Sequence, residues 1–227
     1  MPGSPGWLAV GMTTIGFIGA GNIGSHVARQ AVRHGYDVVL SNSRTPDTLS
    51  ELVAELGPRA RAATGEEAAG AGDLVVVSTP LKAIWSIPAA PTAGKVVIDT
   101  NNYYPTRDGH VAALDEGTAT SSELLQAHLS DARVVKAFNH IGAAAIVDDA
   151  RPEGAPDRRG LVIAGDDDDA KATVTALIEL FGFDVVDAGT LAESWRIEPG
   201  TPGYGPIHNA DELRADLAAS TRGRRES

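Results

Sequence analysis

The chain has 227 residues, and 43% of them are apolar, which is enough for a sizeable core in one large domain or in one domain with a small annex. Its 19 Lys and Arg residues are outnumbered by 30 Asp and Glu residues, and the net charge of -11 disfavours nucleic acid or an anionic membrane as a partner. Because Cys is absent, disulfides, cysteine-ligated metals and a cysteine nucleophile are excluded, and we expect a cytoplasmic protein.

Strand-like apolar runs alternate with helix-like runs along the chain, which is typical of a parallel sheet flanked by helices. We therefore expect a doubly wound, mostly parallel α/β fold with a small C-terminal annex. Strands are predicted at residues 13–19, 37–41, 61–64, 73–79, 95–100, 133–138, 160–164 and 184–188. Helices are predicted at residues 22–34, 46–56, 66–71, 81–87, 121–129, 168–181 and 207–219. Ser121 or Ser122 is the expected N-cap of the helix at 121–129.

The pattern divides the chain into three parts. Residues 1–12 are expected to be a flexible tail, since they have neither the basic region nor the long apolar run of a signal peptide. Residues 13–198 form the predicted sheet domain, and residues 199–227 form an annex of loop, short helix and tail. The aspartates at 166–169 are interpreted as the acidic start of a helix, so no metal site is predicted.

A glycine motif of the form G-x-G-x-x-G follows the first predicted strand and opens the first predicted helix. In a dinucleotide-binding turn, Gly19 would allow the tight bend, Gly21 would let a pyrophosphate approach the backbone, and Gly24 would let the helix pack on the strand. The N–H groups of Asn22 and Ile23, which begin the helix, would face the phosphates. This context favours a dinucleotide site in a Rossmann fold over a purely structural glycine-rich turn.

The end of the second strand predicts which dinucleotide binds. NAD sites usually carry Asp or Glu about 20 residues after the glycines. Here the segment is Ser41-Asn42-Ser43-Arg44, which has no acid. The hydroxyl, amide and guanidinium groups of Asn42, Ser43 and Arg44 can instead bind a 2′-phosphate. We therefore expect NADP(H). The segment could also cap the following helix, and the two roles are compatible.

Polar residues stand at three further strand ends, which in a doubly wound sheet meet at one edge. Ser78, Thr79 and Pro80 follow the valine-rich strand, Asn101 follows the next strand, and residues 136–140 follow the third. We expect this edge to hold the ribose and the nicotinamide. Each strand end alone is also compatible with an ordinary loop cap.

Six segments between residues 13 and 198 together carry a family resemblance: IGFIGAGNIG, SNSR, VVVSTP, KVVIDTNN, RVVKAFN and GFDVVDAGTL. In these segments the chain resembles the F420-dependent NADP oxidoreductases, whose domain also occurs in membrane ferric reductases. The resemblance implies a Rossmann-type reductase that exchanges a hydride between NADPH and coenzyme F420, a deazaflavin. It also implies that Ser43 and Arg44 bind the 2′-phosphate and that Ala137 to Asn139 lie near the nicotinamide.

Asn139 and His140 are the predicted catalytic residues, because both would lie beside the nicotinamide and His140 could position a substrate or donate a proton. His208 is a second histidine candidate, since it follows the glycine-rich loop at 200–206. Four aromatic side chains are expected to stack on a flat acceptor, and each could instead close the core or a subunit contact. They are Tyr103, Tyr104, Trp195 and Tyr204.

These observations predict an oxidoreductase that transfers a hydride between NADP(H) and a deazaflavin (coenzyme F420) or flavin-like acceptor. The alternatives are an NADPH-dependent imine or carbonyl reductase and a non-catalytic NADP(H)-binding sensor. The expected partner is a small-molecule hydride acceptor, with no nucleic acid and no membrane. Because the annex is short, we also expect a second subunit to complete the pocket in a homodimer.

Overall fold

The computed structural model describes residues 14–222. The tail predicted at residues 1–12 and the last part of the predicted annex, residues 223–227, lie outside the described residues. In the described part, no helix is both long and apolar enough to span a membrane.

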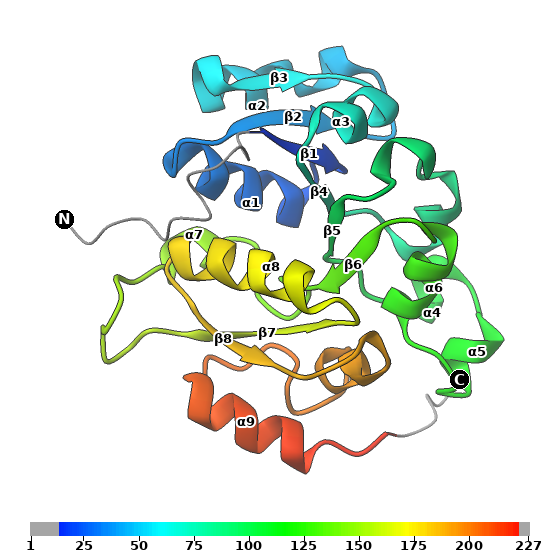
Figure 1. Ribbon diagram of the computed structural model, residues 1–227, viewed down its shortest axis with the longest axis vertical. Helices are drawn as coiled ribbons and strands as arrows, with labels where there is room; N and C mark the ends of the chain where they lie inside the picture. The colour runs from blue at the N-terminus through cyan, green and yellow to red at the C-terminus, as the bar shows by residue number, and fades with distance from the viewer. Residues whose placement is uncertain (1–13, 223–227) are drawn as a thin grey trace.

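Residues 14–222 form an eight-stranded sheet in the order β3-β2-β1-β4-β5-β6-β7-β8 (Figure 1). Strands β1 to β6 are all parallel, in the strand order of a Rossmann fold. Strand β7 runs antiparallel to β6, and β8 is parallel to β7. The predicted doubly wound, mostly parallel sheet is thus confirmed. The strand bounds are β1 Thr14–Ile18, β2 Asp37–Ser41, β3 Ala60–Ala62, β4 Leu74–Val77, β5 Val96–Asp99, β6 Arg133–Lys136, β7 Gly160–Gly165 and β8 Asp184–Asp187.

Helices cover both faces of this sheet. The α-helices are α1 Asn22–Arg33, α2 Ser50–Leu56, α3 Gly65–Ala71, α4 Pro105–Asp108, α5 Ala112–Asp115, α6 Ser121–His128, α7 Ala145–Asp148, α8 Asp168–Leu180 and α9 Ala210–Ala219. The 3₁₀ helices are η1 Pro46–Leu49, η2 Gly57–Arg59, η3 Leu81–Ser86, η4 Ala90–Thr92 and η5 Leu191–Ile197. Helices α1 and α8 lie side by side on one face, and α3, η3 and α6 pack on the other (Figure 1).

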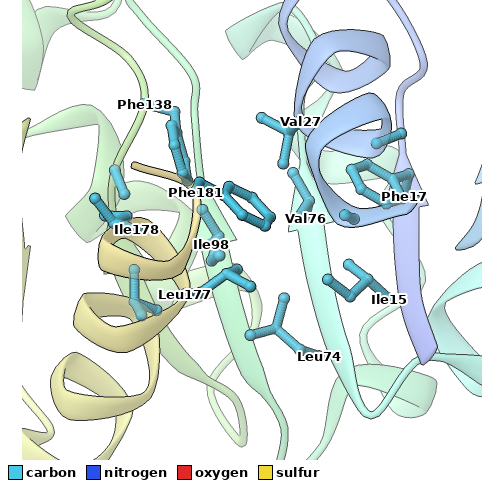
Figure 2. Close-up of a cluster of buried hydrophobic side chains, with 14 of the residues drawn as sticks. Ile15, Phe17, Val27, Leu74, Val76, Ile98, Phe138, Leu177, Ile178 and Phe181 are labelled. Atoms are coloured by element: carbon cyan, nitrogen blue, oxygen red, sulfur yellow. The ribbon is translucent and has the colours of Figure 1, made fainter. Parts of the chain in front are cut away.

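The central strand β4 shows why its valine run suits this architecture. Leu74 and Val76 contribute to the core under α1 and α8, whereas Val75 and Val77 contribute to the core on the opposite face. A strand covered on both faces buries every side chain, so no polar alternation is present. Figure 2 shows the first of these cores, with Val27 of α1 facing the side chains that α8 brings to the same strands. The helix α9 packs separately against β7 and β8, through Leu213 and Leu217.

Several helix predictions differ from the structure. The helix predicted at 46–56 begins as the 3₁₀ helix η1, the one predicted at 81–87 is the 3₁₀ helix η3, and the last helix begins at Ala210 after the cap Asn209. The N-cap of α6 is Thr120, whose side chain accepts from the backbone N–H of Glu123. The prediction of Ser121 or Ser122 as that cap is wrong, because both hydroxyls turn into a buried polar network described below.

Candidate functional site

The glycine motif forms the turn between β1 and α1, and its three glycines differ in their surroundings. Gly19 has a φ of +103°, and a Cβ there would collide with the backbone oxygen of Ser78. A Cβ on Gly24 would collide with the backbone oxygen of Gly19. A Cβ on Gly21 would meet no protein atom within 4 Å. Packing therefore requires two of the glycines, whereas Gly21 leaves a space that the protein itself does not fill.

The first turn of α1 presents backbone N–H groups to this space, and no side chain caps them. Its N-cap is Gly21, which has no side chain to cap the helix, and no acidic residue lies in the first turn. The N–H groups that begin a helix carry a partial positive charge and bind anions such as a pyrophosphate. Both Asn22 and Ile23 line the adjoining cavity.

A cavity of about 610 Å³ extends from the glycine turn along the end of β2. Residues Ser43 and Arg44 line it, and both are exposed. Asn42 shapes this turn, because its side-chain oxygen accepts from the Arg44 backbone N–H at 2.8 Å and its side-chain nitrogen donates to Thr48 at 2.8 Å. Within residues 14–222 the guanidinium of Arg44 has no ion-pair partner, so it is available to a phosphate.

One acidic residue at this cavity was not identified from the sequence. Glu66, in the first turn of α3, lines the same space as Arg44. Its position follows the end of β3, so the rule that ligands gather at the carboxyl ends of parallel strands could have found it.

A second cavity of about 380 Å³ adjoins the first and shares Gly21, Ser78, Thr79 and Pro80 with it. It is also lined by Asn101 and Asn139, so the ends of β4, β5 and β6 come together as predicted. Ala137, the remaining residue of this set, is fully buried and does not line the cavity.

Two buried polar atoms at this second cavity lack a partner. The backbone N–H of Thr79 donates to the side-chain oxygen of Asn101 at 3.0 Å. The hydroxyl of Thr79 and the side-chain nitrogen of Asn101 make no hydrogen bond within the described chain. Leaving such groups buried and unpaired costs about 1–3 kcal/mol each, so they suit a polar ligand such as the ribose or carboxamide of a dinucleotide.

A buried ion pair holds these strand ends in place. Lys136 and Asp99 are opposite each other on β6 and β5, both side chains are fully buried, and Nζ lies 3.1 Å from Oδ2. The Lys136 ammonium also donates to the backbone oxygen of Asn101, while Asp99 accepts from the Asn101 backbone N–H at 2.8 Å. The hydroxyls of Ser121 and Ser122 complete the network. The backbone N–H and the backbone oxygen of Asn101 are therefore both held by the buried ion pair.

Asn139 and His140, the predicted catalytic pair, have different surroundings in the structure, although their side chains contact each other at 3.2 Å. The chain turns at Phe138, whose φ is +58°, and Asn139 then lines the second cavity while donating to the Ile197 backbone oxygen at 2.7 Å. His140 is buried, and its Nε2 accepts from the Val162 backbone N–H at 3.0 Å. The expectation that His140 faces the pocket is wrong, because its ring points into the interior beside β7.

The surroundings of His140 also keep it neutral. Burial lowers its pKa to about 3, and the positive charges of Arg159 and Lys136 act in the same direction. A neutral imidazole with both nitrogens in hydrogen-bonding contacts has no proton to give to a ligand. His208 is not at the cavity either, since it pairs with Asp216 of α9 at 2.7 Å.

Two of the four predicted aromatic residues lie at the second cavity and two do not. Tyr104 and Tyr204 line the second cavity. Tyr103 is 1% exposed, lies in the core and donates to Asp115 at 2.6 Å, and Trp195 lines a different cavity. The expectation that Tyr103 and Trp195 face the acceptor is therefore wrong. Neighbours in an extended segment point in opposite directions, so only one of two consecutive tyrosines can face the cavity.

The strand order, the open glycine turn and the free Arg44 together define an NADP-binding domain of Rossmann type. Residues 14–103 match the family model described as NADP oxidoreductase, coenzyme F420-dependent. The sequence resemblance to this family is thus confirmed over these residues, which include the glycine turn and the segment at the end of β2.

Two solved structures and a curated relative are similar to the chain. The hypothetical protein SMa0349 of Sinorhizobium meliloti is 30% identical, with a TM-score of 0.71 over 88% of this chain and 95% of that chain. A protein of Arthrobacter sp. FB24, provisionally described as an F420-dependent NADP-reductase, is 25% identical, with a TM-score of 0.68 over 81% of this chain and 87% of that one. The metalloreductase STEAP3 of Rattus norvegicus is 30% identical over 187 residues, 81% of this chain. The chain spans only 35% and 39% of the two curated relatives it matches.

Proposed function

We propose that the protein transfers a hydride between NADP(H) and a deazaflavin or flavin-like acceptor. The observation that carries this proposal is the pair of adjoining cavities, which share Gly21 and residues 78–80. A dinucleotide whose 2′-phosphate lies at Arg44 can cross the glycine turn and bring its nicotinamide to Asn101. An acceptor can then approach from the side of Tyr104 and Tyr204.

When bound, NADPH supplies a hydride, a hydrogen nucleus with two electrons, and becomes NADP⁺. The acceptor takes this hydride at a ring carbon or nitrogen and a proton from solvent at another ring nitrogen or oxygen, so that charge and electrons balance. This chemistry needs no acid–base pair from the protein, which agrees with the burial of His140.

The protein's own residues bind and orient. The first turn of α1 and Arg44 would hold the phosphates, and the unpaired groups of Thr79 and Asn101 would fix the ribose or the carboxamide. The Lys136–Asp99 pair would keep Asn101 in position without touching the ligand. Holding two rings in contact in this way is the main source of rate acceleration for hydride transfer.

A screen of NADPH oxidation by the purified protein tests the proposal. Coenzyme F420, FMN, menadione and a cyclic imine are offered in turn, and the loss of NADPH absorbance is followed. We expect turnover with coenzyme F420 or FMN and slower turnover with NADH. Turnover with the imine alone would favour the reductase alternative, and tight NADPH binding without turnover would favour a sensor.

We also propose that the working form is a homodimer. Of the described annex residues, Tyr204 alone lines the second cavity, so this chain leaves much of the acceptor side for another subunit to cover. Sedimentation equilibrium with and without NADPH measures this directly, and a single species of monomer mass in both conditions would contradict it.

A further inference from the structure

Two tyrosines from distant parts of the chain meet at the second cavity. Tyr104 lies between β5 and α4, Tyr204 lies in the loop before α9, and their hydroxyl oxygens are 2.7 Å apart. Both line the cavity that Asn101 and Thr79 also line. The hydrogen bond between the two tyrosines is therefore part of the wall of this cavity.

The hydrogen-bonding groups of this pair leave one proton without an acceptor. Each phenol carries one O–H, and one of these two protons lies between the two oxygens. The other contact of the pair is with the side-chain nitrogen of Asn102, 3.5 Å from the Tyr204 oxygen, and an amide nitrogen only donates. Within residues 14–222, the second phenolic proton has no acceptor.

Tyr204 keeps its proton at neutral pH. Burial raises the pKa of Tyr204 above its ordinary value, and its hydrogen bond with Tyr104 acts in the same direction. Tyr204 therefore takes part in the pair as a neutral phenol and does not act as an acid.

The lining of the cavity has no carboxylate that would repel a neutral or negative acceptor. Its one charged side chain, Arg107, forms an ion pair with the buried Asp108 at 2.8 Å. The guanidinium of Arg107 lies 4.9 Å from the centre of the Tyr104 ring and donates to the backbone oxygen of Asn102 at 2.7 Å. This contact fixes the orientation of the Tyr104 ring, so its hydroxyl is held in place before a ligand arrives.

We propose that the Tyr104–Tyr204 pair recognises the acceptor by donating its free phenolic proton to a carbonyl oxygen on the acceptor ring. The proposal rests on the proposed function and specifies its substrate class: flat, neutral or anionic rings with a carbonyl group, as in the pyrimidinedione of flavins and deazaflavins. A protonated imine has no lone pair with which to accept this proton. The pair contacts the acceptor and lies away from Arg44, so it selects the acceptor and leaves NADPH binding unchanged.

Two single variants and their combination test the pair. We measure the affinity of the NADP⁺-loaded protein for oxidised coenzyme F420 and for FMN by fluorescence titration, in wild type, Tyr104→Phe, Tyr204→Phe and the double variant. Each single variant should weaken binding about tenfold, the loss expected for one hydrogen bond. The double variant should lose less than the product of the two single losses, because the tyrosines share one outward proton.

A matched control separates recognition from folding. Tyr103→Phe removes the neighbouring phenol, which faces the core, and should leave acceptor affinity unchanged even where it lowers the melting temperature. NADPH affinity, measured by calorimetry, should stay within about twofold in both cavity variants, because separate sites behave additively. Unchanged acceptor affinity in both single variants, or a loss of NADPH affinity equal to that of the acceptor, would overturn the proposal.

Turnover measurements on the same proteins distinguish a failure of the tyrosine proposal from a failure of the proposed function. If wild type binds a probe without oxidising NADPH, hydride transfer to that acceptor is rejected, while the variant affinities still decide the role of the tyrosines. If NADPH is oxidised and the variants bind the probe as wild type does, only the tyrosine proposal is rejected. If neither probe binds to wild type, both proposals are rejected.

Discussion

Replacing Gly21 by alanine should abolish tight NADPH binding without unfolding the protein. The φ of Gly21 is -78°, a value that any amino acid adopts, and its Cβ would meet no protein atom within 4 Å. The loss of a helix-capping glycine in favour of alanine costs about 1 kcal/mol at most. The new methyl group instead occupies the space that the pyrophosphate requires.

The expected loss of affinity follows from the donors that the methyl group would separate from the phosphates. A hydrogen bond to a charged group contributes about 1.5–3 kcal/mol, and displacement from one or two backbone N–H groups of α1 costs about 3 kcal/mol. Since 1.4 kcal/mol is a factor of about ten, NADPH should bind roughly 100-fold more weakly. Calorimetric titration measures the affinity, and circular dichroism melting measures the stability.

Gly24→Ala is the matched control for this change. Its Cβ would collide with the Gly19 backbone oxygen and would lie 3.3 Å from the Ser78 Cβ, so the turn itself must move. Overpacking of this kind costs about 1–3 kcal/mol of stability. The same substitution at two positions of one motif should thus affect binding at Gly21 and stability at Gly24. Wild-type NADPH affinity in Gly21→Ala, or loss of its fold, would refute the reasoning.

Three further predictions concern the cofactor phosphate and the buried charges. Arg44→Ala should weaken NADPH binding by about 1–3 kcal/mol and leave NADH binding unchanged, and equal losses by calorimetry would contradict the 2′-phosphate assignment. Lys136→Met should lower the free energy of unfolding in urea by about 3–5 kcal/mol because it leaves Asp99 buried and unpaired, whereas the exposed Lys82→Met should change it by about 0.5 kcal/mol or less. Because burial lowers the pKa of His140 to about 3, its contribution to stability is complete above pH 6.5 and is lost as the pH falls towards 3, by about 1.4 kcal/mol per pH unit. His140→Gln should therefore flatten the acid side of a plot of melting temperature against pH, and an unchanged slope would contradict the buried neutral ring.

The sequence by itself determined the elements that depend on neighbouring residues. The glycine motif between a strand and a helix, the valine run of β4 and the acid-free segment at the end of β2 are local patterns, and each lies where it was predicted. Their physics is local too, since a tight turn, a buried strand and a helix start each depend on a few consecutive residues. The family resemblance was visible in the same segments and is confirmed.

The direction in which a side chain points beyond a strand end was not determined in this way. His140 and Tyr103 were expected at the pocket because they follow strand ends, yet both are buried in the interior. Phe138 adopts a φ of +58°, a conformation that its type rarely adopts and that no sequence pattern announced. The turn that follows is held by a hydrogen bond from the Asn139 side chain to the backbone oxygen of Ile197, 58 positions away.

Contacts between distant segments were decided by the tertiary structure alone. Lys136 and Asp99 form a pair only because the register of β5 and β6 places them opposite each other, with both side chains buried. Tyr104 and Tyr204 are separated by 100 residues and meet only when the loop before α9 folds back onto the segment after β5. The sequence shows which groups a strand end can supply, but the free energy that selects their partners comes from burial and register across the whole sheet.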